Sequence, residues 1–120
     1  MKNSSARKGT LHFTPEDHQK IASLKKTAES TPCWDGARPA DCHRAVVCGV
    51  DIAFFLAVDR EDASGQYQLH ITGKEGQPAL EVVQAMAVPF FGDQPFQILP
   101  DERHPARIRV LGLFFDHAGR

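Results

Sequence analysis

The chain has 120 residues, of which 42% are apolar and 24% charged, and this length and composition fit one globular domain with its own core. Its net charge of −1, from 14 basic and 15 acidic side chains, disfavours nucleic acid as the main partner, because proteins that bind the phosphate backbone usually carry a clear positive excess. No apolar run approaches the ~20 residues that a membrane helix needs, which argues against a membrane protein.

The N-terminal third predicts a tail, a helix and an irregular loop. Residues 1–10 are polar and basic, so we expect a flexible tail in front of a single domain at 11–120. Thr14 suits an N-cap, and the helix is predicted to run from Pro15 to about Glu29. Its apolar stripe consists of Ile21, Leu24 and Ala28. Two prolines and a glycine make residues 30–42 irregular, and this loop holds Trp34, the only tryptophan.

Residues 45–71 predict a β-hairpin at the centre of the fold. Alternation places the large apolar side chains of both strands on one face and pairs Phe54 with Ile71, Leu56 with Leu69 and Val58 with Tyr67. The charged connection at residues 59–66 is predicted to be a loop. The second face, where Phe55 and His70 lie near each other, is only half apolar, as expected of an antiparallel sheet with one face toward solvent.

The C-terminal half predicts a second helix and two further strands. The helix starts at Pro78, packs on the sheet and ends near Val88, because Pro89 disfavours helical geometry in the residue before it. Strands follow at residues 96–99 and 107–115, and Gly112 predicts a bulge or bend in the last one. The fold class is therefore α+β, in the order helix-strand-strand-helix-strand-strand, with two helices and a four-stranded, mainly antiparallel sheet.

The cysteines bear on location and on metal binding. Three of them, without an export signal, favour reduced thiols and a cytoplasmic location. Cys33, Cys42 and His43, with Cys48 or His70, are the ligand types that zinc takes, but the pattern lacks two thiolates at close spacing. If residues 42–48 form a strand, Cys42 and Cys48 lie roughly 20 Å apart. We expect no metal or other cofactor, and a zinc-stabilised module of Cys33, Cys42 and His43 is the alternative.

The sequence contains no familiar catalytic signature. It has no glycine-rich phosphate loop, no nucleophile elbow and no HExxH motif. Cys42 and His43 are adjacent, which in a strand sends them to opposite faces, so a cysteine nucleophile with a histidine base is not expected. A small enzyme stays an alternative, with His70 as the base in a pocket between the second helix and the sheet.

Aromatic side chains suggest an interface. Adjacent rings in a strand lie on opposite faces, so one of each pair lies outside the main core unless a second layer covers it. Exposed aromatic clusters often mark interfaces, and we expect one that includes Trp34, Phe55, Phe91 and Phe115. A homodimer through an uncovered sheet face would account for both observations. The competing interpretation is that the first helix, or the loop with Trp34, covers this face.

Three short stretches, Leu69-His70-Ile71, Gly76-Gln77-Pro78 and Ile98-Leu99-Pro100, resemble small uncharacterised proteins carried by phages and prophages. The resemblance covers under half of the chain and brings no catalytic residues. It implies a phage-encoded accessory protein that binds and inhibits a host or defence protein. Since no catalytic set was found, we expect a small non-enzymatic protein-binding module whose partner is another protein or a second copy of itself.

Overall fold

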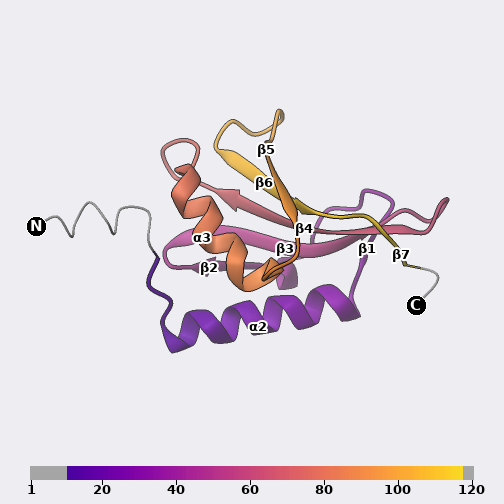
Figure 1. The fold of residues 1–120 in the computed structure, drawn as a ribbon, viewed down its shortest axis with the longest axis horizontal. Coiled ribbons are helices and arrows are strands. Elements are labelled where there is room, and N and C mark those ends of the chain that lie inside the picture. Colours follow the sequence, from indigo (N-terminus) through magenta and orange to yellow (C-terminus); the bar gives the residue numbers. More distant parts are fainter. Residues whose placement is uncertain (1–10, 118–120) are drawn as a thin grey trace, which may run out of the picture.

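The computed structural model describes residues 11–117, and the predicted tail at 1–10 lies outside this range. Within it, two α-helices and seven strands form an α+β fold in which every strand joins one mixed sheet (Figure 1). The elements are α2 (Pro15–Ser30), β1 (Cys33–Trp34), the 3₁₀ turn η1 (Asp41–His43), β2 (Arg44–Val47), β3 (Val50–Val58), β4 (Ser64–Thr72), α3 (Leu80–Phe91), β5 (Phe96–Pro100), β6 (Arg107–Gly112) and β7 (Phe115–Asp116). The α+β class and the two helices are confirmed, whereas the prediction of four strands was too low. No helix in this range combines the length and apolarity that crossing a bilayer requires.

Strands β3 and β4 form the centre of the sheet. β3 pairs antiparallel with β4, β4 with β6, and β6 with β5. On the other side of β3, two short strands share one edge: β2 pairs antiparallel with residues 50–53, and β1 pairs parallel with residues 57–58. β7 pairs with the first residues of β4, on the same side of β4 as β6. The parallel pairing of β1 makes the sheet mixed and was not predicted.

Both helices pack on one face of the sheet, which we call the covered face. α2 lies against β2 and β3, and α3 lies against β4 and β6. The predicted stripe of α2 is buried there with α3 residues and the inward side chains of the strands, including Phe54, Leu69, Ile71 and Val110. Within residues 11–117 no α-helix packs on the opposite face, and we call it the open face. His70 points to the open face, so the predicted pocket between the second helix and the sheet was placed on the wrong side.

The central hairpin has a register two residues away from the predicted one. Phe54 pairs with Leu69, Leu56 with Tyr67 and Val58 with Gly65. Such a shift keeps every side chain on its face, so alternation alone does not distinguish the two registers. The connection is shorter than predicted, at residues 59–63, because Asp59 and Asp62 accept backbone N–H bonds within the turn at 2.7 and 2.8 Å.

The predicted first strand is in fact two strands. β2 and β3 are joined by a two-residue turn at Cys48 and Gly49, whose φ angles are 53° and 75°. Tight hairpin turns need positive φ at both central residues, a conformation that asparagine, aspartate and glycine adopt most easily. Cysteine at the first position gives no such signal, so the turn was missed.

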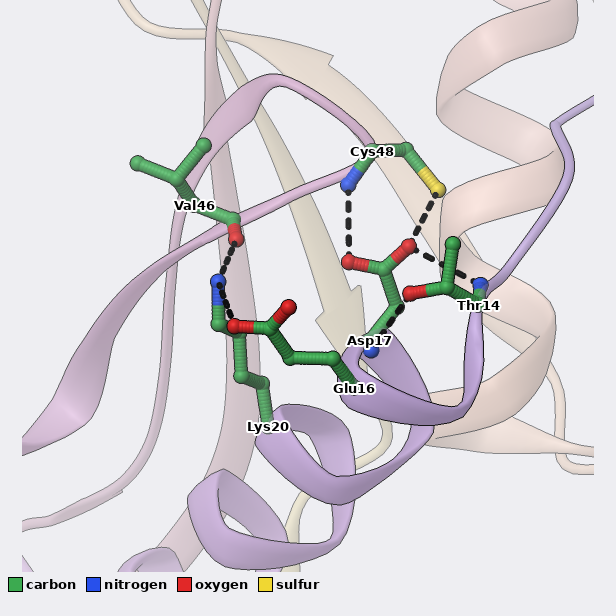
Figure 2. A network of polar contacts seen from close by, with 6 residues as sticks. All are labelled: Thr14, Glu16, Asp17, Lys20, Val46 and Cys48. Atoms are coloured by element: carbon green, nitrogen blue, oxygen red, sulfur yellow. Dashed lines mark hydrogen bonds and ion pairs between the residues drawn. The ribbon is translucent and has the colours of Figure 1, made fainter.

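The start of α2 holds this turn in place (Figure 2). Thr14 Oγ1 accepts the Asp17 N–H at 3.0 Å, and Asp17 Oδ2 accepts the Thr14 N–H at 3.0 Å, which completes a capping box. Asp17 Oδ1 also accepts the Cys48 N–H at 3.3 Å, and Lys20 Nζ donates to Val46 O at 2.9 Å. Burial raises the pKa of Cys48 to about 11, and the neighbouring charge of Asp17 adds to this, so the thiol stays protonated.

Helix α3 continues past the proline that was predicted to end it. Pro89 lies inside the last turn, and the helix ends at Phe91, before Gly92 with φ 59°. Proline removes one backbone hydrogen-bond donor from the helix. Two contacts offset this loss: the turn buries Phe90 and Phe91 in the core, and Lys25 Nζ donates to Pro89 O at 3.0 Å. The predicted strand at residues 107–115, with a bulge or bend at Gly112, is instead two strands: β6 ends at Gly112, and β7 begins at Phe115.

Candidate functional site

The four aromatic residues predicted for an interface do not form one surface. Phe91 is 6% exposed and packs against Phe54 and Phe96 in the core. Phe55, 5% exposed, lies on the open face, where Cys33 and Ala53 cover its ring. Cys33 belongs to β1, which pairs with β3, so part of the segment predicted as an irregular loop joins the sheet beside Phe55.

Trp34 and Phe115 lie at the same end of the sheet, where β1 pairs with the end of β3 and β7 with the start of β4. Trp34 is 36% exposed, and Phe115 is half-buried. The ring of His117 lies 5.6 Å from that of Trp34 and 6.4 Å from that of Phe115. Among residues 11–117, the most exposed large apolar side chains are Leu113 and Phe114, which precede Phe115, at 67% and 70%. The sequence did not indicate these two residues, because its pattern predicted a single strand at residues 107–115.

Of the residues of the zinc alternative, His43 is already engaged by the backbone. Both ring nitrogens of His43 bond the backbone: Nδ1 accepts the Ala40 N–H at 3.2 Å, and Nε2–H donates to Thr31 O at 2.9 Å. Burial raises the pKa of the Cys33 thiol, and Cys42 adds to this. Among residues 11–117 no three His, Cys, Asp or Glu side chains are arranged to hold a metal ion. Metal ligation by His43 would require one of its two bonds to break.

The open face carries a cleft of about 1140 Å³, which we call the arginine basin. Its floor consists of Ala53 and Phe55 from β3 with Gln68 and His70 from β4. The loop at residues 36–39 after β1 and the turn at residues 101–104 between β5 and β6 also line it. Ala53 and Ala57 lie two residues before and after Phe55 on the same face of β3, and their small side chains do not fill this part of the cleft.

Positive charge predominates in the arginine basin. Counting only described residues, its lining holds Arg38, Arg44, Arg103, Arg107 and Arg109 against Asp51, Asp101 and Glu102. Arg107 is engaged, because its Nε donates to Thr72 Oγ1 at 3.2 Å and its guanidinium lies 3.8 Å from the Asp101 carboxylate. Arg109 Nε is buried and has no hydrogen-bond partner within residues 11–117. A buried donor left in this state is costly.

His70 lies at the centre of the basin floor. Its ring is edge-on to Phe55 with centroids 5.0 Å apart, which confirms that these two side chains lie together. Its Nε2 is 3.0 Å from Gln68 Oε1. Burial lowers the pKa of His70 to about 4, and the charges of Arg107, Arg109 and Arg44 act in the same direction while Asp101 opposes them. The imidazole is therefore neutral at neutral pH.

The arrangement suits the binding of an anion on an open sheet face. The sequence signal for it was partial: Arg107 and Arg109 alternate with the apolar residues of their strand, but only the register across three strands brings them beside His70. Arg44 joins them from β2, a strand that the sequence did not reveal. Comparison with known proteins finds no match for this chain among family models, curated proteins or solved structures.

Proposed function

We propose that this chain is a non-enzymatic protein-binding module whose binding surface is the arginine basin. The proposed occupant is an acidic, extended segment of a partner protein. The observation that carries this proposal is the excess of arginines over carboxylates in a cleft whose floor is partly apolar. Charge complementarity of this kind steers association and selects partners. Arginine is also the side chain best suited to carboxylates, since its planar fork can bond both oxygens at once.

The size and shape of the basin support an extended segment. Pockets for small molecules usually measure ~300–1000 Å³ and enclose most of their ligand. This cleft is about 1140 Å³ and lies on an uncovered sheet face between two loops. An extended peptide can cross such a face, with its carboxylates on the arginines and its apolar atoms over the floor.

A protein segment fits better than single-stranded nucleic acid. Sheets that bind single strands present aromatic rings on which bases stack. The aromatic ring in the basin floor, Phe55, is sealed by its neighbours and offers no stacking face. The net charge of −1 also gives the chain no general attraction to phosphate backbones.

The basin also bears on the homodimer expectation. A two-fold dimer brings the same patch of both copies together, so the arginines of two basins would meet like charge. A different protein is therefore the favoured occupant of the basin. The resemblance to phage-encoded proteins adds the expectation that this partner is a host or defence protein, which the module would inhibit by occupying its acidic segment.

A second candidate is a small enzyme with His70 as general base. It is favoured by the position of His70 in a cleft, beside arginines that would hold an anionic substrate. General bases work best with a pKa near the working pH, and the pKa of His70 is about 4. We rank this candidate second for that reason.

A degenerate peptide library passed over the immobilised protein tests the proposal. We expect retained peptides to be enriched in aspartate and glutamate, and Arg44→Glu with Arg103→Glu to abolish the enrichment, because both side chains are exposed and line the basin. Lys74→Glu is the control, since it makes the same charge change in an exposed loop outside the basin. Retention without acidic enrichment, or a preference for a single-stranded RNA oligonucleotide over every peptide, would refute the proposal.

A further inference from the structure

The tautomer of His70 follows from a chain of hydrogen bonds along β4. Gln66 Nε2 lies 2.9 Å from Gly112 O, a carbonyl that can only accept, so the amide nitrogen of Gln66 must face it. Gln66 Oε1 is then the acceptor for Gln68 Nε2 at 3.0 Å, which leaves Gln68 Oε1 to accept from His70 Nε2–H at 3.0 Å. The proton of the neutral imidazole is therefore on Nε2, and Nδ1 carries a lone pair.

Arginines face this histidine from both sides. In the register of the sheet, His70 lies directly opposite Arg109 on β6 and Ala53 on β3, and Arg44 on β2 lies opposite Ala53. These four residues form one row across the open face, in which neighbouring strands are ~4.8 Å apart. Ala53 is small, so no large side chain separates Arg44 from His70. The other charged or titratable residues lining the basin are Cys33, Arg38, Asp51, Asp101, Glu102, Arg103, His104 and Arg107.

The hydrogen-bond donors of the two arginines and the acceptor on His70 determine which chemical group would bind to this row. Arg109 Nε is a buried donor with no partner in the described chain, and Arg44 forms no ion pair there. His70 Nδ1 carries a lone pair that can accept a hydrogen bond. A carboxylate meets the arginines but has no proton for Nδ1, whereas a phosphate monoester keeps an ionisable proton with a pKa near 6 and carries three acceptor oxygens.

We propose that the row Arg44, His70 and Arg109 is a subsite for the phosphate monoester of a phosphorylated residue in the acidic segment. This inference rests on the proposed function and names the residue at the centre of the segment. The phosphate oxygens accept from Arg109 and Arg44, and the remaining phosphate proton is shared with His70 Nδ1. No bond is made or broken apart from this proton shift. Binding raises the proton affinity of His70, because the anion offsets the arginine charges around it.

Two peptide pools that differ only in a central serine or phosphoserine test the subsite. We expect the phosphorylated pool to be retained about tenfold more strongly by the wild-type protein, since charge-assisted bonds from both arginines to the phosphate oxygens add to the bonds made by the flanking acids. Arg109→Gln and His70→Gln are expected to remove this preference while the unphosphorylated pool still binds. Arg103→Gln is the matched control, because it changes the same basin outside the row and should weaken both pools alike.

NMR of the His70 ring nitrogens gives a second measurement. We expect the phosphorylated pool to move the Nδ1 signal toward that of a protonated ring and to raise the pKa of His70, and inorganic phosphate alone to do neither at the same concentration. Equal retention of the two pools by the wild type would overturn the subsite and leave the proposed function standing. If equimolar inorganic phosphate displaced the phosphorylated pool, the ligand of the subsite would be free phosphate and not a phosphorylated residue of a peptide, and this result would overturn the proposed ligand. Retention of neither pool would overturn the proposed function itself.

Discussion

Replacement of His70 by glutamine should remove part of the pH dependence of stability. The folded state lowers the pKa of His70 from 6.5 to about 4, mainly by burial. Between these values the unfolded chain binds more protons than the folded one, so stability is complete above pH 6.5 and falls as the pH drops toward 4. The linkage amounts to about 2 kcal/mol lost between about pH 7 and about pH 4.5. Glutamine has no titration there, yet its amide can still donate to Gln68.

Urea denaturation at the two pH values measures the effect. The wild type should lose about 2 kcal/mol more than His70→Gln between them, equivalent to about 1 M in the urea midpoint. The other titrating groups act in both proteins and cancel in this difference. His18→Gln serves as control, since it removes an exposed histidine of α2 and leaves His70 in place, and it should follow the wild type. Equal losses in the wild type and His70→Gln would show that the ring is not held neutral by its surroundings.

Two further predictions concern the start of α2 and the turn that it holds. Thr14→Ala should lower the free energy of unfolding by about 1 kcal/mol, because it removes the hydroxyl that accepts the Asp17 N–H. Urea denaturation measures this change, and Ser23→Ala, on the exposed side of the helix, is the control variant. Iodoacetamide near neutral pH should modify exposed Cys42 before Cys48, whose pKa is about 11, and Asp17→Asn should speed the labelling of Cys48 in a mass-spectrometric time course. Equal stability of the two alanine variants, or labelling of Cys48 as fast as Cys42, would contradict these assignments.

Local signals in the sequence predicted the helices and the faces of the strands. The cap at Thr14 and the stripe of Ile21, Leu24 and Ala28 depend only on neighbours three or four residues away, and the structure confirms both. The same holds for the side of the central hairpin on which Phe55 and His70 lie, because alternation has a period of two. Features of this kind need no knowledge of distant parts of the chain.

Features that depend on distant contacts could not be predicted. The turn at Cys48 is stabilised by Asp17, which lies 31 residues earlier in the chain. Pro89 is tolerated inside α3 because the following rings are buried and Lys25 reaches its carbonyl from α2. The pairing of β1 with β3 involves only two residues and leaves no periodic trace. In each case tertiary packing decided against the local preference.

The row of Arg44, Ala53, His70 and Arg109 in the arginine basin also depends on contacts between distant parts of the chain. A shift of β4 by two residues would keep His70 on the open face and Tyr67, Leu69 and Ile71 on the covered face, so burial alone does not select the observed register. Gly65 contributes to it: a β-carbon there would lie 3.0 Å from the Phe115 ring and 3.4 Å from Leu56, so a larger residue opposite Val58 would crowd these side chains while β7 pairs with β4. This contact lies at the far end of β4 from His70, within the same β3–β4 pairing that places Ala53 opposite the histidine. The order of Arg44, Ala53, His70 and Arg109 across the sheet therefore depends on contacts at a distance from it, and we expect a substitution at Gly65 that shifts the β3–β4 pairing to disturb the subsite without touching it.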